Sequence, residues 1–249
     1  MKIAVLVAVL FVSSCGQRTA IPRFQVADFT GEWVVKDYIE EVRRTREPHQ
    51  AWSPELWALS FSVVKAGPQA KYDFNATTLN EGGLSGTISR LEPAERSDVL
   101  RLVIAGQEDY LLLRIESGDK HPVETVRVED SRGSSALFVR LPTTLEQYVN
   151  RLVIAGRYRD VSGEEYSFDE AGEARWPGKT FHYEVSLNPI EAGCEYIEHD
   201  DPNGVGGRKR YGYRWNEEEL DLFDINYVGT KRCNICCDAK PFAALRRHN

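Results

Sequence analysis

The sequence has few histidines and lacks the short motifs that mark several common catalytic and metal sites. Its 249 residues include only five histidines, which stand apart from one another. It contains no Gly-x-Ser-x-Gly motif, no phosphate-binding loop and no His-Glu-x-x-His motif. We therefore expect no catalytic residue, no metal site and no cofactor. A non-catalytic protein is favoured, although these absences do not decide whether the chain is an enzyme.

Positive charge is outnumbered by negative charge, since 31 Lys and Arg face 38 Asp and Glu and the formal net charge is −7. The basic runs Arg43-Arg44, Arg208-Lys209-Arg210 and Arg246-Arg247 are short. Proteins that bind nucleic acids neutralise phosphates with many lysines and arginines. We therefore expect no nucleic-acid partner, and we interpret the basic runs as solvated loops or ends.

The longest apolar run is too short to cross a membrane. It covers residues 3–12 behind Lys2, whereas a membrane-spanning helix needs about 20 apolar residues. A basic start, a short apolar stretch and small residues before a break are typical of a secretory signal peptide. We predict a signal peptide over residues 1–14.

The end of this leader, Val12-Ser13-Ser14-Cys15, resembles the lipobox of bacterial lipoproteins. The resemblance implies cleavage before Cys15, which would then carry the lipid, while residues 15–25 tether the folded part to the membrane. Gly16 after the cysteine resembles lipoproteins sent to the outer membrane. We expect a cell-envelope protein anchored there and facing the periplasm. The alternative is an ordinary signal peptide with a cysteine at its cleavage site.

Alternation of apolar and polar residues indicates an all-β fold. Strand-like runs separated by turn residues are typical of an antiparallel barrel or sandwich. We expect an N-terminal β domain over residues 26–142 and a C-terminal β subdomain with a cysteine-rich tail over 156–249. In the first domain the predicted strands are 59–65, 72–78, 84–91, 99–104, 110–115, 124–128 and 136–141.

The second domain is centred on residues 156–187. Phe181, Tyr183 and Val185 are expected on a buried face and His182 on the other face. The turns are predicted at Ser162-Gly163, Ala171-Gly172 and Pro177-Gly178.

The tripeptide Gly31-Glu32-Trp33 resembles the first-strand motif of lipocalins, in which the tryptophan closes the base of a barrel. The resemblance implies a lipocalin-like barrel. The alternative is that Trp33 is simply an aromatic residue of the core.

One amphipathic helix is predicted over residues 143–155, because Thr143-x-x-Glu146 has the form of a capping box and apolar residues recur at spacings of three and four. It would link the two β units. Residues 37–47 form either a short helix or a charged strand edge. The hexamer RLVIAG occurs at 101–106 and again at 151–156, and we expect it to be strand once and helix once.

Four cysteines remain after Cys15, namely Cys194, Cys233, Cys236 and Cys237. In an oxidising compartment an even number indicates two disulfides. Adjacent cysteines rarely satisfy disulfide geometry, so we expect Cys194 to pair within the cluster 233–237. A zinc site that includes His199 and a redox Cys-x-x-Cys are the alternatives.

Three functions remain open at this stage. The first is a module that binds a small hydrophobic ligand or an envelope protein, and the ligand-binding form predicts an apolar cavity lined by Trp57, Phe61 and Tyr72. The second is an assembly or structural factor that uses a sheet edge or an aromatic patch. The third, ranked below them, is an envelope enzyme that depends on thiols or metal.

Overall fold

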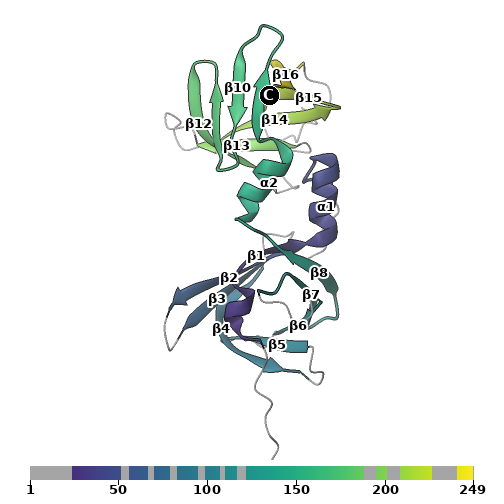
Figure 1. Ribbon diagram of the computed structural model, residues 1–249, viewed down its shortest axis with the longest axis vertical. Coiled ribbons are helices and arrows are strands. Elements are labelled where there is room, and N and C mark those ends of the chain that lie inside the picture. Colours follow the sequence, from purple (N-terminus) through teal and green to yellow (C-terminus); the bar gives the residue numbers. More distant parts are fainter. Residues whose placement is uncertain are drawn as a thin grey trace, which may run out of the picture.

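The computed structural model describes residues 24–51, 56–66, 70–78, 83–94, 99–106, 110–116, 122–187, 195–200, 208–225 and 240–248. These residues form two closed antiparallel β-barrels at the two ends of an elongated molecule (Figure 1). Two helices lie between the barrels. The expected all-β class is therefore confirmed in its barrel form, with two β units.

Barrel 1 contains the first eight strands, which follow one another around the barrel in sequence order. It closes where the first strand pairs with the last, in the register Trp33 to Arg140 and Val34 to Val139. A short 3-10 helix, η1 (Val26–Phe29), precedes it. The strands are β1 (Gly31–Val35), β2 (Leu56–Lys65), β3 (Lys71–Thr78), β4 (Gly83–Pro93), β5 (Val99–Ile104), β6 (Tyr110–Ile115), β7 (Thr125–Asp130) and β8 (Ser135–Arg140).

Barrel 2 repeats this arrangement with the next eight strands. Its closing strand is drawn from residues that we expected to form a tail. In this strand Arg246 pairs with Arg159 and Arg247 with Tyr158. The strands are β9 (Gly156–Arg159), β10 (Glu165–Phe168), β11 (Glu173–Trp176), β12 (Lys179–Val185), β13 (Tyr196–Asp200), β14 (Arg208–Asn216), β15 (Glu219–Asp224) and β16 (Ala243–Arg247).

The helices are α1 (Lys36–Thr45) and α2 (Leu145–Val153). Helix α1 shows that residues 37–47, for which a short helix and a charged strand edge were both open, are mainly helical. Two helices rather than one therefore lie between the barrels. The second confirms the predicted linking helix, but its N-cap is Thr144, whose hydroxyl accepts from the Gln147 amide. Neither helix has the length and apolar character needed to cross a membrane, and no other helix in the described residues has them.

Turn chemistry matches the sequence prediction in barrel 2. Gly163, Gly172 and Gly178 all have positive φ angles, at 87°, 96° and 74°. At Gly172 the requirement is strict, because a Cβ atom there would lie 2.7 Å from the Tyr183 carbonyl oxygen. Only glycine adopts such an angle without strain, so these turns fix the hairpins of β9 to β12.

Large side chains fill the interiors of both barrels. In barrel 1, Phe29 of η1 packs against Trp33 and Phe61, with ring centroids 6.4 and 6.0 Å apart. In barrel 2, Trp176 packs against Phe181 and Tyr211 at 4.9 and 4.8 Å. The buried apolar side chains form one continuous cluster that includes residues of both barrels and of both helices. The barrels and the helices between them therefore share a single core.

Candidate functional site at the waist

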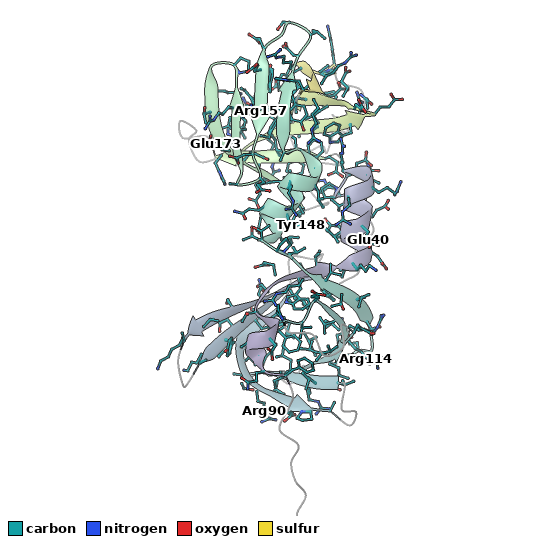
Figure 2. All side chains as sticks on the ribbon, in the orientation of Figure 1. Glu40, Arg90, Arg114, Tyr148, Arg157 and Glu173 are labelled. Carbon is teal, nitrogen blue, oxygen red and sulfur yellow. The ribbon has the colours of Figure 1, made fainter. Side chains whose placement is uncertain are left out.

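We call the region between the barrels, formed by α1, residues 46–51 and α2, the waist. The helices pack against each other there, and the Arg43 Nη2 atom donates to the Tyr148 hydroxyl at 2.9 Å. Figure 2 shows Tyr148 and Glu40 on the two helices, between the side chains of the two barrels.

Helix α1 ends in a left-handed turn that leads the chain onto barrel 2. Arg46 has a φ angle of 62°, and its amide donates to the Val42 carbonyl at 2.8 Å. Such a conformation is uncommon for a residue other than glycine. It places the Arg46 guanidinium over the Trp215 ring, 4.1 Å from the centroid, in a cation–π contact.

A buried carboxyl group of barrel 2 binds the backbone of the residues that follow Arg46. Glu195 lies just before β13 and is only 4% exposed. Its Oε1 atom accepts hydrogen bonds from the backbone amides of His49 and Gln50, at 2.8 and 3.3 Å. Its Oε2 atom accepts from the Tyr213 hydroxyl at 3.3 Å and lies 3.7 Å from the His49 Nδ1 atom. Glu195 thus ties residues 46–51 to barrel 2.

Burial changes the ionisation of this cluster. Desolvation raises the pKa of Glu195 to about 8, although the hydrogen bonds from His49 and Gln50 oppose the shift. Burial, and secondly the charge of Glu195, also raise the pKa values of the Tyr38 and Tyr213 phenols. At neutral pH the Glu195 carboxyl and the Tyr38 and Tyr213 phenols are therefore mainly uncharged hydrogen-bonding groups. A raised pKa can mark a catalytic acid, but this carboxyl is almost sealed from solvent and acts as a tie between elements.

The C-terminal end of α2 is fixed to barrel 2 through its backbone. The last carbonyl groups of a helix lack partners inside the helix. Here the carbonyls of Val153 and Ile154 accept from the Trp215 indole and the Tyr158 hydroxyl, at 3.1 and 2.6 Å. The Arg247 guanidinium donates to the Ala155 carbonyl. A cation at this end also interacts favourably with the negative end of the helix dipole. These contacts hold the waist and barrel 2 together.

An open pocket of about 680 Å³ lies beside these contacts, and we call it the waist pocket. Its lining carries three guanidinium groups and three carboxylates together with an indole ring, and Arg246 and Glu219 in this lining form an ion pair at 3.0 Å. Glu217 and Glu218 are exposed in the turn between β14 and β15. The lining residues are Arg46, Trp215, Asn216, Glu217, Glu218, Glu219, Arg246 and Arg247. Such a surface suits a polar partner that carries charges of both signs.

The residues expected to line an apolar ligand cavity occupy a different environment. Phe61 is 3% exposed and packs against Phe74, with ring centroids 5.1 Å apart. Tyr72 is half-buried at the edge of the same core. The side chain of Trp57 lies outside the described residues. Phe61 therefore fills the interior of barrel 1 instead of lining an open space.

The predicted cysteine sites cannot be placed, since all of them lie outside the described residues: Cys15, Cys194, Cys233, Cys236 and Cys237. Lipid attachment at Cys15 and the disulfide pairing stay predictions. Among the described residues, no group of three or more His, Cys, Asp and Glu side chains could hold a metal ion.

Sequence reasoning did not find the waist cluster. Glu195, Tyr38 and Tyr213 come from three separate parts of the chain. Glu195 and Tyr213 meet through the pairing of β13 with β14, where the Tyr213 amide donates to the Glu195 carbonyl at 3.0 Å, and Tyr38 comes from α1. Nothing in the sequence around Trp215 indicates that Arg46 is its partner. Comparison of the chain with protein families, curated proteins and solved structures finds no match in any of the three.

Proposed function

We propose that this chain is a lipid-anchored protein of the bacterial cell envelope that binds an envelope protein through the waist pocket. The observation that carries the proposal is the contrast between an open, charged waist pocket and barrels whose interiors are occupied by packed side chains. Binding sites are concave surfaces with a few fixed polar groups. The waist pocket has this form, with Trp215 held in place by its bond to Val153.

A small hydrophobic ligand is the less favoured partner. It would need an apolar cavity, and Phe61, which was expected to line one, is packed against the Phe29 and Phe74 rings. A segment of another protein can offer both charge signs and an apolar side chain to stack on Trp215. Charge complementarity of this kind gives specificity and fast association.

The closed barrels also bear on the assembly-factor alternative. Each strand of the two described barrels pairs with a neighbour on both sides, so none of them offers a free edge to a partner strand. A partner would therefore contact side chains at the waist and would not extend a sheet.

The anchor rests on the sequence Val12-Ser13-Ser14-Cys15 and on the leader before it. Several acyl chains on one cysteine hold a protein stably on a membrane, unlike a single chain. We expect Cys15→Ser to release the protein from the membrane fraction or to block its processing. Mass spectrometry of the mature N-terminus checks the modification directly, and an unmodified Cys15 would refute it.

Partner binding can be tested by photocrosslinking in cells. A photoreactive residue at Glu218, on the rim of the waist pocket, should give a discrete crosslinked species. The same residue at Val161, which is 95% exposed at the far turn of barrel 2, serves as the control.

A pair of matched variants then tests the pocket itself. Arg246→Gln removes a guanidinium of the waist pocket, whereas Arg175→Gln removes another exposed one, which pairs with Glu173 elsewhere on barrel 2. We expect the first variant to weaken the crosslink at position 218 and the second to leave it unchanged. Equal crosslinking from positions 218 and 161, or equal effects of the two variants, would contradict the proposal.

A further inference from the structure

Three arginines stand side by side on the outer face of barrel 1. Arg101, Arg114 and Arg127 occupy the neighbouring strands β5, β6 and β7, and Arg114 lies directly opposite Arg127 in the register. Residues that alternate with them, such as Leu100 and Leu113, are buried in the barrel. Like charges directly opposite each other on a sheet are destabilising. Two carboxylates accompany the arginines, since Glu92 lies opposite Arg101 in the register and Glu116 pairs with Arg127.

The three side chains surround a small groove of about 230 Å³. Its apolar lining includes Val99 and Leu112, and Glu129 is the acidic residue among its lining residues. We call it the arginine groove. Figure 2 shows Arg114 on barrel 1, well away from the helices of the waist.

The three guanidinium groups differ in their interaction partners. The Arg127 Nε atom donates to Glu116 Oε1 at 3.1 Å, and the Arg101 guanidinium lies over the Tyr110 ring, 4.5 Å from its centroid. For Arg114, the described part of the structure provides neither a hydrogen bond nor an ion pair, and its Nε atom is buried. A buried donor without a partner costs about 1–3 kcal/mol. The Nη atoms of Arg114 are not buried, so a ligand in the groove could accept hydrogen bonds from this guanidinium through them.

We propose that the arginine groove binds a phosphate ester. Guanidinium groups present paired donors that match phosphate oxygens, and two or three of them can share one phosphate. Val99 and Leu112 offer apolar contact to the organic part of the ester, and the Glu129 carboxylate can accept a hydrogen bond from a ligand hydroxyl. The same chemistry occurs in the glycerol phosphate headgroup of an anionic phospholipid and in a soluble glycerol phosphate.

Calorimetric titrations of the full-length protein in nonionic detergent test the proposal. One arm adds micelles doped with phosphatidylglycerol, a second adds glycerol phosphate, and phosphatidylcholine-doped micelles serve as the neutral-headgroup control. We expect saturable binding in the first or second arm. Binding in the first arm alone identifies the membrane as the source, and binding in both identifies the headgroup chemistry itself.

Variants assign the binding to the groove. Arg114→Gln should weaken affinity about tenfold or more, the order of one charge-assisted hydrogen-bond pair. Arg90→Gln is the matched control, because Arg90 lies on the same barrel, is exposed and pairs with Glu92. If Arg114→Gln does not fold, as judged by circular dichroism, Arg101→Gln takes its place. Absence of binding in both arms, or equal affinity for the groove variant and the control, would overturn the proposal.

Discussion

The buried carboxyl of Glu195 should make the stability of the protein depend on pH in an unusual direction. The folded protein keeps the proton up to about pH 8, whereas the unfolded chain releases it near the ordinary value of 4.5. Between these two values the unfolded state binds fewer protons than the folded state. The free energy of unfolding therefore falls as pH rises, by at most about 1.4 kcal/mol per pH unit.

The change Glu195→Gln isolates this effect. A glutamine cannot titrate, yet its side-chain oxygen can still accept from the His49 and Gln50 amides. From about pH 5 to about pH 8 the wild-type protein should lose on the order of 3 kcal/mol of stability relative to the variant. The stabilising contribution is fully present below the unfolded pKa and is lost as pH rises through the folded pKa.

Urea denaturation at a series of pH values measures the difference. The control is Glu218→Gln, which removes an exposed carboxylate from the rim of the waist pocket and should leave the slope of stability against pH close to that of the wild type. Parallel pH profiles for the wild-type protein and Glu195→Gln would show that the folded protein does not hold this proton, and would refute the reasoning.

Three further predictions concern the core, a turn and the cysteines. Phe181→Ala should lower the free energy of unfolding by about 3–5 kcal/mol in thermal or urea melts, because the ring packs against Trp176 and His199. His182→Ala, on the exposed face of the same strand, should lower it by less than about 1 kcal/mol. Equal losses for the two variants would mean that the strand face is misassigned. Gly172→Ala and Gly163→Ala should each cost about 1–3 kcal/mol in the same melts, because both glycines have positive φ angles. The loss should be larger at Gly172, where a Cβ would also lie 2.7 Å from the Tyr183 carbonyl oxygen, than at Gly163, where it would meet nothing within 4 Å. Thiol counting in denatured, unreduced periplasmic material should find Cys194, Cys233, Cys236 and Cys237 oxidised, and four free thiols would contradict the disulfide prediction and favour a metal or redox role.

Local patterns were enough to predict most of the strands. In barrel 1 the predicted strand 99–104 coincides with β5, and 72–78 differs from β3 by one residue. These strands alternate apolar and polar residues because one face lies in a packed barrel, and that constraint is visible in the sequence itself. The closure of each barrel was not visible, since pairing between β1 and β8 joins segments about a hundred residues apart.

The hexamer RLVIAG shows that a short sequence alone does not determine its secondary structure. At 101–106 it supplies the last residues of β5, and at 151–156 it supplies the end of α2 and the first residue of β9. The same six residues thus adopt both structures, as predicted. The second copy follows the Thr144 cap, and the helix that it ends contacts β12 and Trp215 of barrel 2, so the surrounding chain decides the outcome.

The strand β16 was missed for a related reason. Its sequence, AALRR, has little β-branched or aromatic content, and only Ala243 and Leu245 are buried. Its strand conformation comes from the two neighbours between which it fits, β15 and β9. The waist sites depend on contacts between distant segments in the same way, so residue patterns alone could not reveal them.

The position of β16 also fixes the order in which the molecule can be completed as the chain emerges from the ribosome or a translocation channel. Barrel 1 has all its strands once residue 140 has emerged, whereas β9 and β15 must wait for residues 243–247. Until then both strands present unpaired backbone groups, which are prone to aberrant pairing with other chains. The second half of the molecule therefore passes through a vulnerable interval that the first half avoids. A nascent-chain series truncated before residue 243 should bind chaperones more strongly than one that extends past residue 247.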